Sequence, residues 1–183
     1  MHSSLSLSLA LLALAARASA HGWIGLLRVD GALYAGPASR ENGAAVLPHS
    51  PVWQVGSQGP VQNLTDSDMA CGNGAHTPAP ALAAARPGSN VTLQWTNGDG
   101  GRWIHPWGSM QTYLARCAGA GGCATADPTT LDWFKISAIG QSKLHANVWY
   151  MAELRKHLFS VGPCTECSCA SSERRLDEHR PPF

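Results

Sequence analysis

Hydrophobic and polar residues alternate in several short stretches of the chain. The clearest is 90–95, in which valine, leucine and tryptophan alternate with asparagine, threonine and glutamine. This period of two places the apolar side chains on one face, as in a strand that is buried on one side. A second stretch, 24–29, runs into the hairpin-turn dipeptide Asp30-Gly31, and residues 32–34 form the expected returning strand.

Two further strands are predicted at 110–117 and 131–136, with the glycine-rich turn 119–122 between them. Many short strands separated by glycine and proline indicate a mainly β protein of the sandwich type. The stretch 37–60 is rich in proline, glycine and serine and has little period. It is therefore predicted to be a long surface loop, of the kind that often carries function.

The pattern changes after Gln141. Four apolar residues and one arginine recur at helical spacing: Leu144, Val148, Met151, Arg155 and Leu158. This spacing predicts a helix over 142–158 that ends before Gly162-Pro163. The last twenty residues contain three cysteines and a charged run. We interpret them as an irregular, solvated tail.

The first twenty residues have the features of a cleaved signal peptide. Residues 5–15 form a short apolar run, and Ala18-Ser19-Ala20 supplies the small-x-small pattern that precedes a cleavage site. A membrane anchor is the alternative, but the run is well short of the ~20 apolar residues that a spanning helix needs. We therefore divide the chain into a leader (1–20), a β-sandwich domain (21–141) and a divergent C-terminal segment (142–183).

Composition narrows the function classes. The chain has 183 residues, 44% of them hydrophobic and 14% charged, which fits one globular domain. A net charge of +1 gives no positive field for nucleic acid or an anionic membrane. For a secreted, extracellular protein, the six cysteines favour disulfides over zinc ligands or reactive thiols, and the sequons at Asn63 and Asn90 agree with export.

Cleavage after Ala20 would leave a histidine at the new N-terminus. His21 then offers two nitrogen donors, its α-amine and its imidazole, which suit the tetragonal nitrogen sites of Cu(II). The α-amine has an unperturbed pKa near ~8, so a metal displaces its proton at mild pH. The alternative is that cleavage leaves a histidine there by coincidence.

At this point the chain resembles the fungal lytic polysaccharide monooxygenases of auxiliary activity family 9. The resemblance covers about two thirds of the mature chain and rests on seven segments: His21-Gly22-Trp23, 59–61, 68–71, 88–95, His105 with Gly108, 112–117 and 132–136. The resemblance implies an immunoglobulin-like or fibronectin-like β-sandwich and oxidative cleavage of cellulose or hemicellulose by hydrogen abstraction at a glycosidic carbon.

The resemblance also implies the site. His21 and His105 would be the catalytic metal ligands of one copper ion that cycles between Cu(II) and Cu(I). An external donor would supply the electrons, and the protein would be a monomer. The alternative for His105 is a loop histidine packed by neighbouring tryptophans. The family analogy also suggests a disulfide between Cys117 and Cys123.

The second half of the family domain has no recognisable counterpart beyond about Leu154, including the axial tyrosine, so we expect an incomplete sandwich. The C-terminal segment is either the product of an unspliced intron or a shifted reading frame, or a genuine variant in which one of its three cysteines pairs with Cys71. A non-catalytic extracellular protein that binds copper or a glycan is the alternative function.

Overall fold

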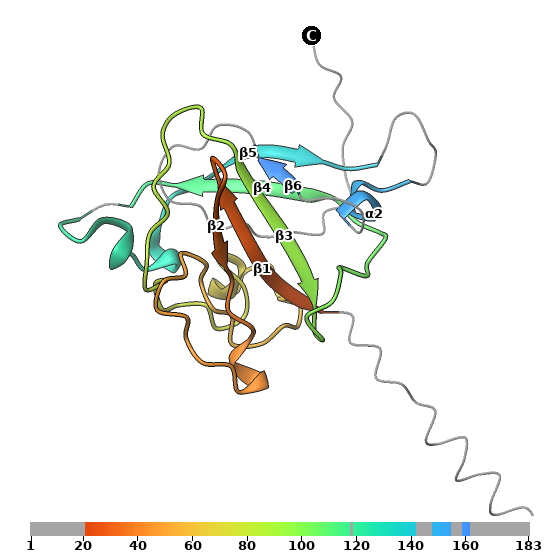
Figure 1. Ribbon diagram of the computed structural model, residues 1–183, viewed down its shortest axis with the longest axis horizontal. Helices are drawn as coiled ribbons and strands as arrows, with labels where there is room; N and C mark the ends of the chain where they lie inside the picture. Colours follow the sequence, from red (N-terminus) through yellow and green to blue (C-terminus); the bar gives the residue numbers. More distant parts are fainter. Residues whose placement is uncertain (1–20, 118, 142–147, 155–158, 162–183) are drawn as a thin grey trace, which may run out of the picture.

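The computed structural model describes residues 21–117, 119–141, 148–154 and 159–161 (Figure 1). The predicted leader and the cysteine-containing tail lie outside these residues. The described strands are β1 (Gly22–Val29), β2 (Ala32–Ala35), β3 (Val91–Asn97), β4 (Met110–Ala115), β5 (Trp133–Ile139) and β6 (Phe159–Val161). The helix α2 spans Tyr150–Leu154, and four 3-10 turns are η1 (Arg40–Asn42), η2 (Ser67–Met69), η3 (Gly122–Ala124) and η4 (Pro128–Thr130).

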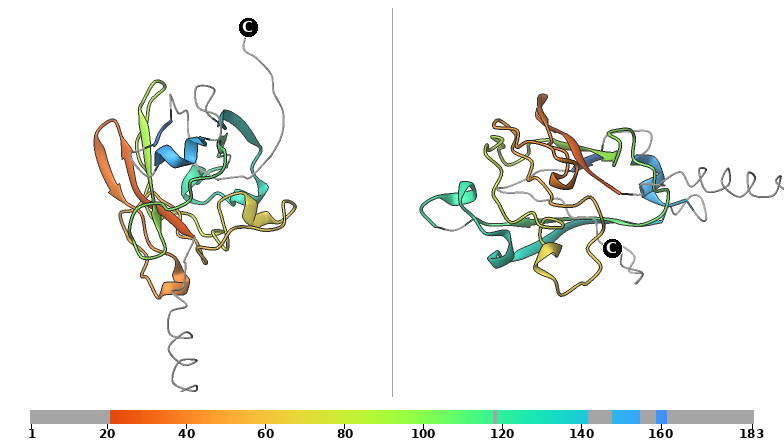
Figure 2. Two further views of the ribbon diagram at one scale, coloured as in Figure 1. Left: turned by 90° about the vertical axis from the view of Figure 1, so that its right-hand side faces the viewer. Right: turned by 90° about the horizontal axis from the view of Figure 1, so that it is seen from below.

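The strands form two antiparallel sheets. One has the order β2-β1-β3-β6, and the other pairs β4 with β5. Figure 2 shows the sheets as two layers, with α2 near the space between them. The mainly β, two-layer prediction is confirmed, and the five predicted strands are present as β1 to β5, with ends that differ by a few residues.

The hairpin predicted at Asp30-Gly31 joins β1 to β2, with Val29 opposite Ala32. Asp30 has φ +47° and Gly31 has φ +93°. Both values are in the left-handed region that a two-residue turn of type I′ requires. Asp30 also accepts hydrogen bonds from the Ser89 hydroxyl (2.6 Å) and the Asn90 amide (2.8 Å), which tie the turn to the start of β3.

The core lies between the two sheets. Val91 and Leu93 of β3 are buried, as the alternating pattern predicts. The core cluster joins both sheets, α2 and the loop before β4, and its buried members are Leu27, Val29, Val91, Leu93, Trp103, Met110, Leu114 and Met151. Because this cluster draws on segments far apart in the sequence, it holds the two layers together.

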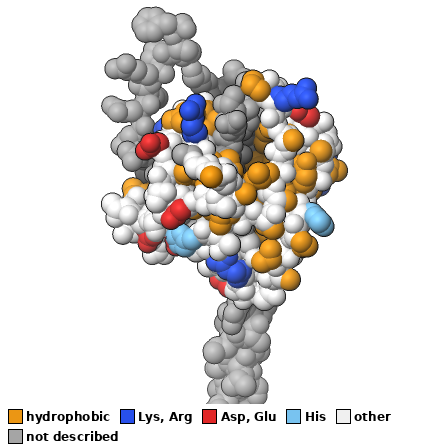
Figure 3. Space-filling view, turned by 90° about the vertical axis from the view of Figure 1, so that its left-hand side faces the viewer, with side chains coloured by type: hydrophobic (Ala, Val, Ile, Leu, Met, Phe, Trp, Pro, Cys, Tyr) orange, Lys and Arg blue, Asp and Glu red, His pale blue; other side chains and the backbone are white. Residues whose placement is uncertain are grey.

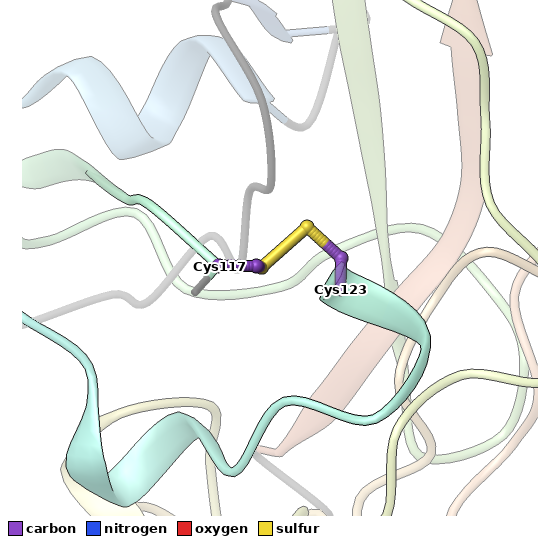
Figure 4. Close-up of a disulfide and its surroundings, with 2 residues drawn as sticks. All are labelled: Cys117 and Cys123. Carbon is purple, nitrogen blue, oxygen red and sulfur yellow. A yellow bond between two sulfur atoms is a disulfide. The ribbon is translucent and has the colours of Figure 1, made fainter. Parts of the chain in front are cut away.

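A disulfide closes the loop that follows β4 (Figure 4). Cys117 and Cys123 are bonded, with their Cα atoms 5.0 Å apart. The glycine-rich segment between them makes the tight closure sterically easy, because glycine adopts positive φ without strain. This is the pairing that the resemblance suggests.

The predicted C-terminal helix differs from the observed one. The described helix begins only at Tyr150, and Trp149 instead forms an isolated bridge with Gln141. The Tyr150 amide donates to the Gly140 carbonyl (3.1 Å), so the chain at Val148 and Trp149 is held against the end of β5. The helix prediction is therefore wrong at these two residues, and its ranges 142–147 and 155–158 lie outside the described part of the chain.

Strand β6 pairs with β3 but was not predicted. Its three residues are too few to show an alternating pattern, and they lie between the end of the predicted helix at 158 and Gly162-Pro163. Only the pairing with β3 identifies them as a strand.

The buried side chain of Leu114 supplies a test of the core. Leu114 is 2% exposed in β4, whereas Leu33 of β2 is 56% exposed. We expect Leu114→Ala to lower the free energy of unfolding by about 2–5 kcal/mol, because it leaves a cavity between the sheets. Leu33→Ala is the matched control and should change it much less. Chemical denaturation of both variants measures the difference, and equal losses would contradict this packing.

The Asp30 turn predicts a pH dependence of stability. The hydrogen bonds from Ser89 and Asn90 lower the pKa of Asp30 from its ordinary value of 3.8. The ionised carboxylate therefore stabilises the fold above that value, and the contribution is lost as the pH falls through the lowered pKa. We expect Asp30→Asn to be less stable than the wild type at neutral pH, with the gap closing in acid.

Thermal denaturation at several pH values measures this gap. Asp99→Asn, which changes an exposed carboxylate in another turn, is the control. A gap that stays constant from neutral pH into strong acid would show that the carboxylate charge has no role in the turn.

Candidate functional site

A cavity of about 740 Å³ brings together the two histidines singled out in the sequence. It is lined by the start of β1, the inner side of β3, the loop before β4 and two long loop segments, 51–64 and 68–73. Five of the seven tryptophans of the chain contribute to its wall: Trp23, Trp53, Trp95, Trp103 and Trp107. The cavity is therefore apolar and aromatic in character, with His21 and His105 both on its wall.

The position of His21 depends on the residue that follows it. Gly22 begins β1 and lies opposite Asn97, the last residue of β3. A Cβ atom at Gly22 would collide with the carbonyl oxygen of Thr96. Glycine therefore lets β1 approach β3 closely enough to hold His21 at the end of this strand pair.

His105 comes from the loop that joins β3 to β4. Its ring lies 5.0 Å from the ring of Trp103, and the ring of Trp103 lies 5.5 Å from that of Trp95, measured between centroids. Trp103 is buried in the core cluster. His105 is thus packed against a tryptophan and also lines the cavity, and its role as a metal ligand stays a prediction.

The same loop is held against α2 at Gly108. This residue has φ +125°, which disfavours any other side chain. A Cβ atom there would lie 2.6 Å from the sulfur of Met151. The glycine thus allows the loop that carries His105 to pack on the helix.

A clamp centred on Arg40 holds the loop wall of the cavity. Its guanidinium donates to the carbonyl oxygens of Gln54 (3.1 Å) and Gly74. Two backbone hydrogen bonds add to these contacts: the Arg40 amide donates to the Val55 carbonyl, and the Gly56 amide donates to the Asn73 carbonyl. Three loop segments are joined in this way, and no pattern in the sequence pointed to it, because the partners are backbone atoms.

The neighbouring Glu41 reinforces this wall. Its carboxylate accepts a hydrogen bond from the Gln58 amide (2.7 Å). This bond and the Ser57 hydroxyl hold the pKa of Glu41 below its ordinary value of 4.5, and the nearby charge of His21 acts in the same direction. Glu41 is therefore an ionised group in the electrostatic surroundings of His21.

Asp68 organises the loop at the other side of the cavity. Its Oδ1 atom accepts from the Gly74 amide (2.9 Å) and lies 2.7 Å from Nε2 of His76. Cys71, in the same loop, lines the cavity and is disulfide-bonded. No pattern in the sequence indicated the Asp68–His76 pair, in which the His76 side chain is exposed.

The histidines are the nitrogen donors that the cavity wall offers. Across the described residues, no group of three or more histidine, cysteine, aspartate or glutamate side chains is arranged to hold a metal. None of the three tyrosines of the chain lines the cavity. A metal at this place would therefore take nitrogen ligands from the imidazoles of His21 and His105, whereas Asp68, which also lines the cavity, already contacts Gly74 and His76.

Apolar side chains are also exposed on the outside. Trp107, on the cavity wall, is 65% exposed. Figure 3 shows hydrophobic side chains gathered on one face of the molecule, with the charged side chains scattered around them. In the described parts of the chain, no helix is both long enough and apolar enough to cross a bilayer.

The model of Auxiliary Activity family 9 (formerly GH61) matches residues 21–163. The chain belongs to auxiliary activity family 9. The matched region begins at His21 and continues beyond residue 136, where the recognisable motifs end, to include α2 and β6.

Curated AA9 proteins are similar over most of this chain. The AA9 family lytic polysaccharide monooxygenase D of Gloeophyllum trabeum is 36% identical over 146 residues, which are 80% of this chain and 40% of that protein. The AA9 family lytic polysaccharide monooxygenase F of Botryotinia fuckeliana is 36% identical over 72% of this chain and 54% of that protein. The chain thus spans about half the length of these AA9 relatives.

Solved structures have the same fold. Cel61B of Hypocrea jecorina, described as a glycoside hydrolase family 61 member, superposes with a TM-score of 0.65 at 27% identity over 78% of this chain and 64% of that one. HiLPMO9B superposes with a TM-score of 0.61 at 24% identity, which bears on the fold alone.

The Arg40 clamp predicts a local effect of substitution. Arg40→Met keeps an apolar stem but removes the donors to Gln54 and Gly74. We expect faster hydrogen exchange at the amides of 55–59 and 73–74, and a loss of roughly 1 kcal/mol in the free energy of unfolding. Arg28→Met, an exposed arginine in β1, is the control. Unchanged exchange in these loops would show that the guanidinium does not hold the cavity wall.

Proposed function

We propose that this AA9 protein is exported, begins at His21 after removal of residues 1–20, and binds one copper ion through His21 and His105. Its function would be oxidative cleavage of a polysaccharide, cellulose or a related β-glucan, by hydrogen abstraction at a glycosidic carbon. The observation that carries the proposal is that both imidazoles line one cavity. They come from segments more than eighty positions apart in the sequence.

The donors suit copper. After removal of the leader, the α-amine of His21 would join the two imidazoles and give three nitrogen ligands, which Cu(II) prefers in tetragonal sites. The described residues offer no competing cluster of carboxylates or thiolates. When bound, copper supplies the one-electron redox chemistry and oxygen activation of the reaction, with electrons from an external donor.

The protein's own residues would fix this geometry. Gly22 sets the position of His21 against β3, and Trp103 packs on the ring of His105. Trp107 is exposed next to the site and presents an aromatic surface on which an extended polysaccharide can lie. We infer that the protein is a monomer on an incomplete immunoglobulin-like sandwich, with sequons that would be modified during export.

The second candidate is a non-catalytic extracellular protein that binds copper or a polysaccharide. None of the tyrosines lines the cavity, and the chain spans about half of its relatives. Groups around metal ligands typically change metal affinity or activity by about 10–100-fold. Loss of these groups would leave a site that binds copper with little turnover.

Substitution of His105 tests the metal site. We expect the mature protein that begins at His21 to bind one Cu(II) with nitrogen hyperfine structure in the electron paramagnetic resonance spectrum. His105→Ala should lose this signature, because one imidazole is removed. His49→Ala, an exposed loop histidine, should keep it, and titration calorimetry should show the same difference in affinity.

Product analysis separates the two candidate functions. Copper-loaded protein with a reductant is incubated with cellulose, and oxidised oligosaccharides are measured by mass spectrometry. Products that disappear in His105→Ala and persist in His49→Ala would support catalysis. Copper binding without oxidised products would support the binding function, and failure of the mature protein to bind copper would contradict both copper roles.

A further inference from the structure

The two sequons lie at different places relative to the cavity. Asn63 is flanked by Gln62 and Leu64, and both of these neighbours line the cavity. Leu64 is also 56% exposed, so the segment is at once cavity wall and outer surface. Asn63 therefore lies on the rim of the cavity that contains His21 and His105.

The local structure presents the Asn63 side chain to solvent. Its Oδ1 atom accepts hydrogen bonds from the Thr65 amide (3.0 Å) and the Thr65 hydroxyl (2.9 Å). The Asp66 amide donates to the Asn63 carbonyl (3.1 Å), which closes a turn. The carboxamide oxygen is thus bonded within the sequon, and Asn63, Leu64 and Thr65 are all exposed.

Asn90 lies at the other end of the sheet. The Asn90 amide donates to the carboxylate of Asp30, which follows the last residue of β1. His21 precedes the first residue of the same strand. Eight strand residues at ~3.3 Å each separate these ends by roughly 26 Å. Val91, the middle residue of this sequon, is buried in β3. A modification at Asn90 would therefore lie far from the cavity.

We propose that Asn63 carries an N-linked glycan that stands on the rim of the cavity and narrows the directions from which large molecules, a polysaccharide included, can approach it. The inference rests on the export step of the proposed function, because N-glycosylation occurs in the secretory pathway. An N-glycan is bulky and hydrated. It would screen Leu64, the next residue in the chain, from a polymer while leaving small solutes free to enter.

The experiment uses the full chain secreted from a eukaryotic host and kept free of copper. The wild type is compared with Asn63→Gln, Asn90→Gln and the double variant. Glycopeptide mass spectrometry reports occupancy at each asparagine, and N-terminal sequencing of the same samples reports whether the chain begins at His21. Tryptophan fluorescence quenching by a nitroxide coupled to dextran, and by the same nitroxide free in solution, reports access to the cavity.

We expect a glycan at Asn63 and the loss of one glycan from the intact mass of Asn63→Gln. The quenching constant of the dextran-bound nitroxide should rise in Asn63→Gln and stay at the wild-type value in Asn90→Gln. The free nitroxide should quench all forms alike. Because Asn63→Gln also alters the turn, trimming of folded Asn90→Gln with an endoglycosidase provides the same comparison at Asn63 without substituting that residue.

An unmodified Asn63 in protein that begins at His21 would overturn the proposal. Equal quenching by the dextran-bound nitroxide before and after trimming would also overturn it. If the N-terminus is uncleaved and both sequons are unmodified, export itself fails, and this proposal fails with it. Adsorption to insoluble cellulose separates a failure of the proposed substrate from a failure of the Asn63 proposal. If no form adsorbs but quenching still depends on the glycan, the polysaccharide substrate is contradicted and the Asn63 proposal is supported.

Discussion

The close antiparallel pairing of β1 with β3 is the constraint on which the site depends. The two backbones approach so closely at Gly22 that no side chain fits between that residue and Thr96. His21 therefore has its place set by a backbone contact in the sheet. The loop that leaves the other strand of this pair carries His105, so a single strand pair positions both ends of the proposed copper site.

The core and the site share residues. Trp103 belongs to the buried cluster between the sheets and also packs on the ring of His105. Met151 of α2 fills a similar role, because it is part of the core, lines the cavity and meets the loop at Gly108. Packing of the two layers thus sets the orientation of the site, and a weaker core would disturb it directly.

The same layers are only partly covered. The chain spans about half the length of its AA9 relatives, and the sheet formed by β4 and β5 leaves Phe134 and Ile136 exposed. A large cavity lined by tryptophans lies beside the histidines. The loop wall compensates locally through polar contacts, in which Arg40, Glu41 and Asp68 bind backbone amides and carbonyls.

The sequence by itself determined the strands, the Asp30-Gly31 hairpin and the family motifs, because side-chain period and turn chemistry are local properties. It also singled out His21 and His105 as a pair. Only the tertiary structure decided that both line one cavity, that β6 is a strand and that Trp149 is not helical. It alone revealed the Arg40 clamp. These features depend on backbone contacts between distant segments, and such contacts leave no periodic trace in the order of the residues.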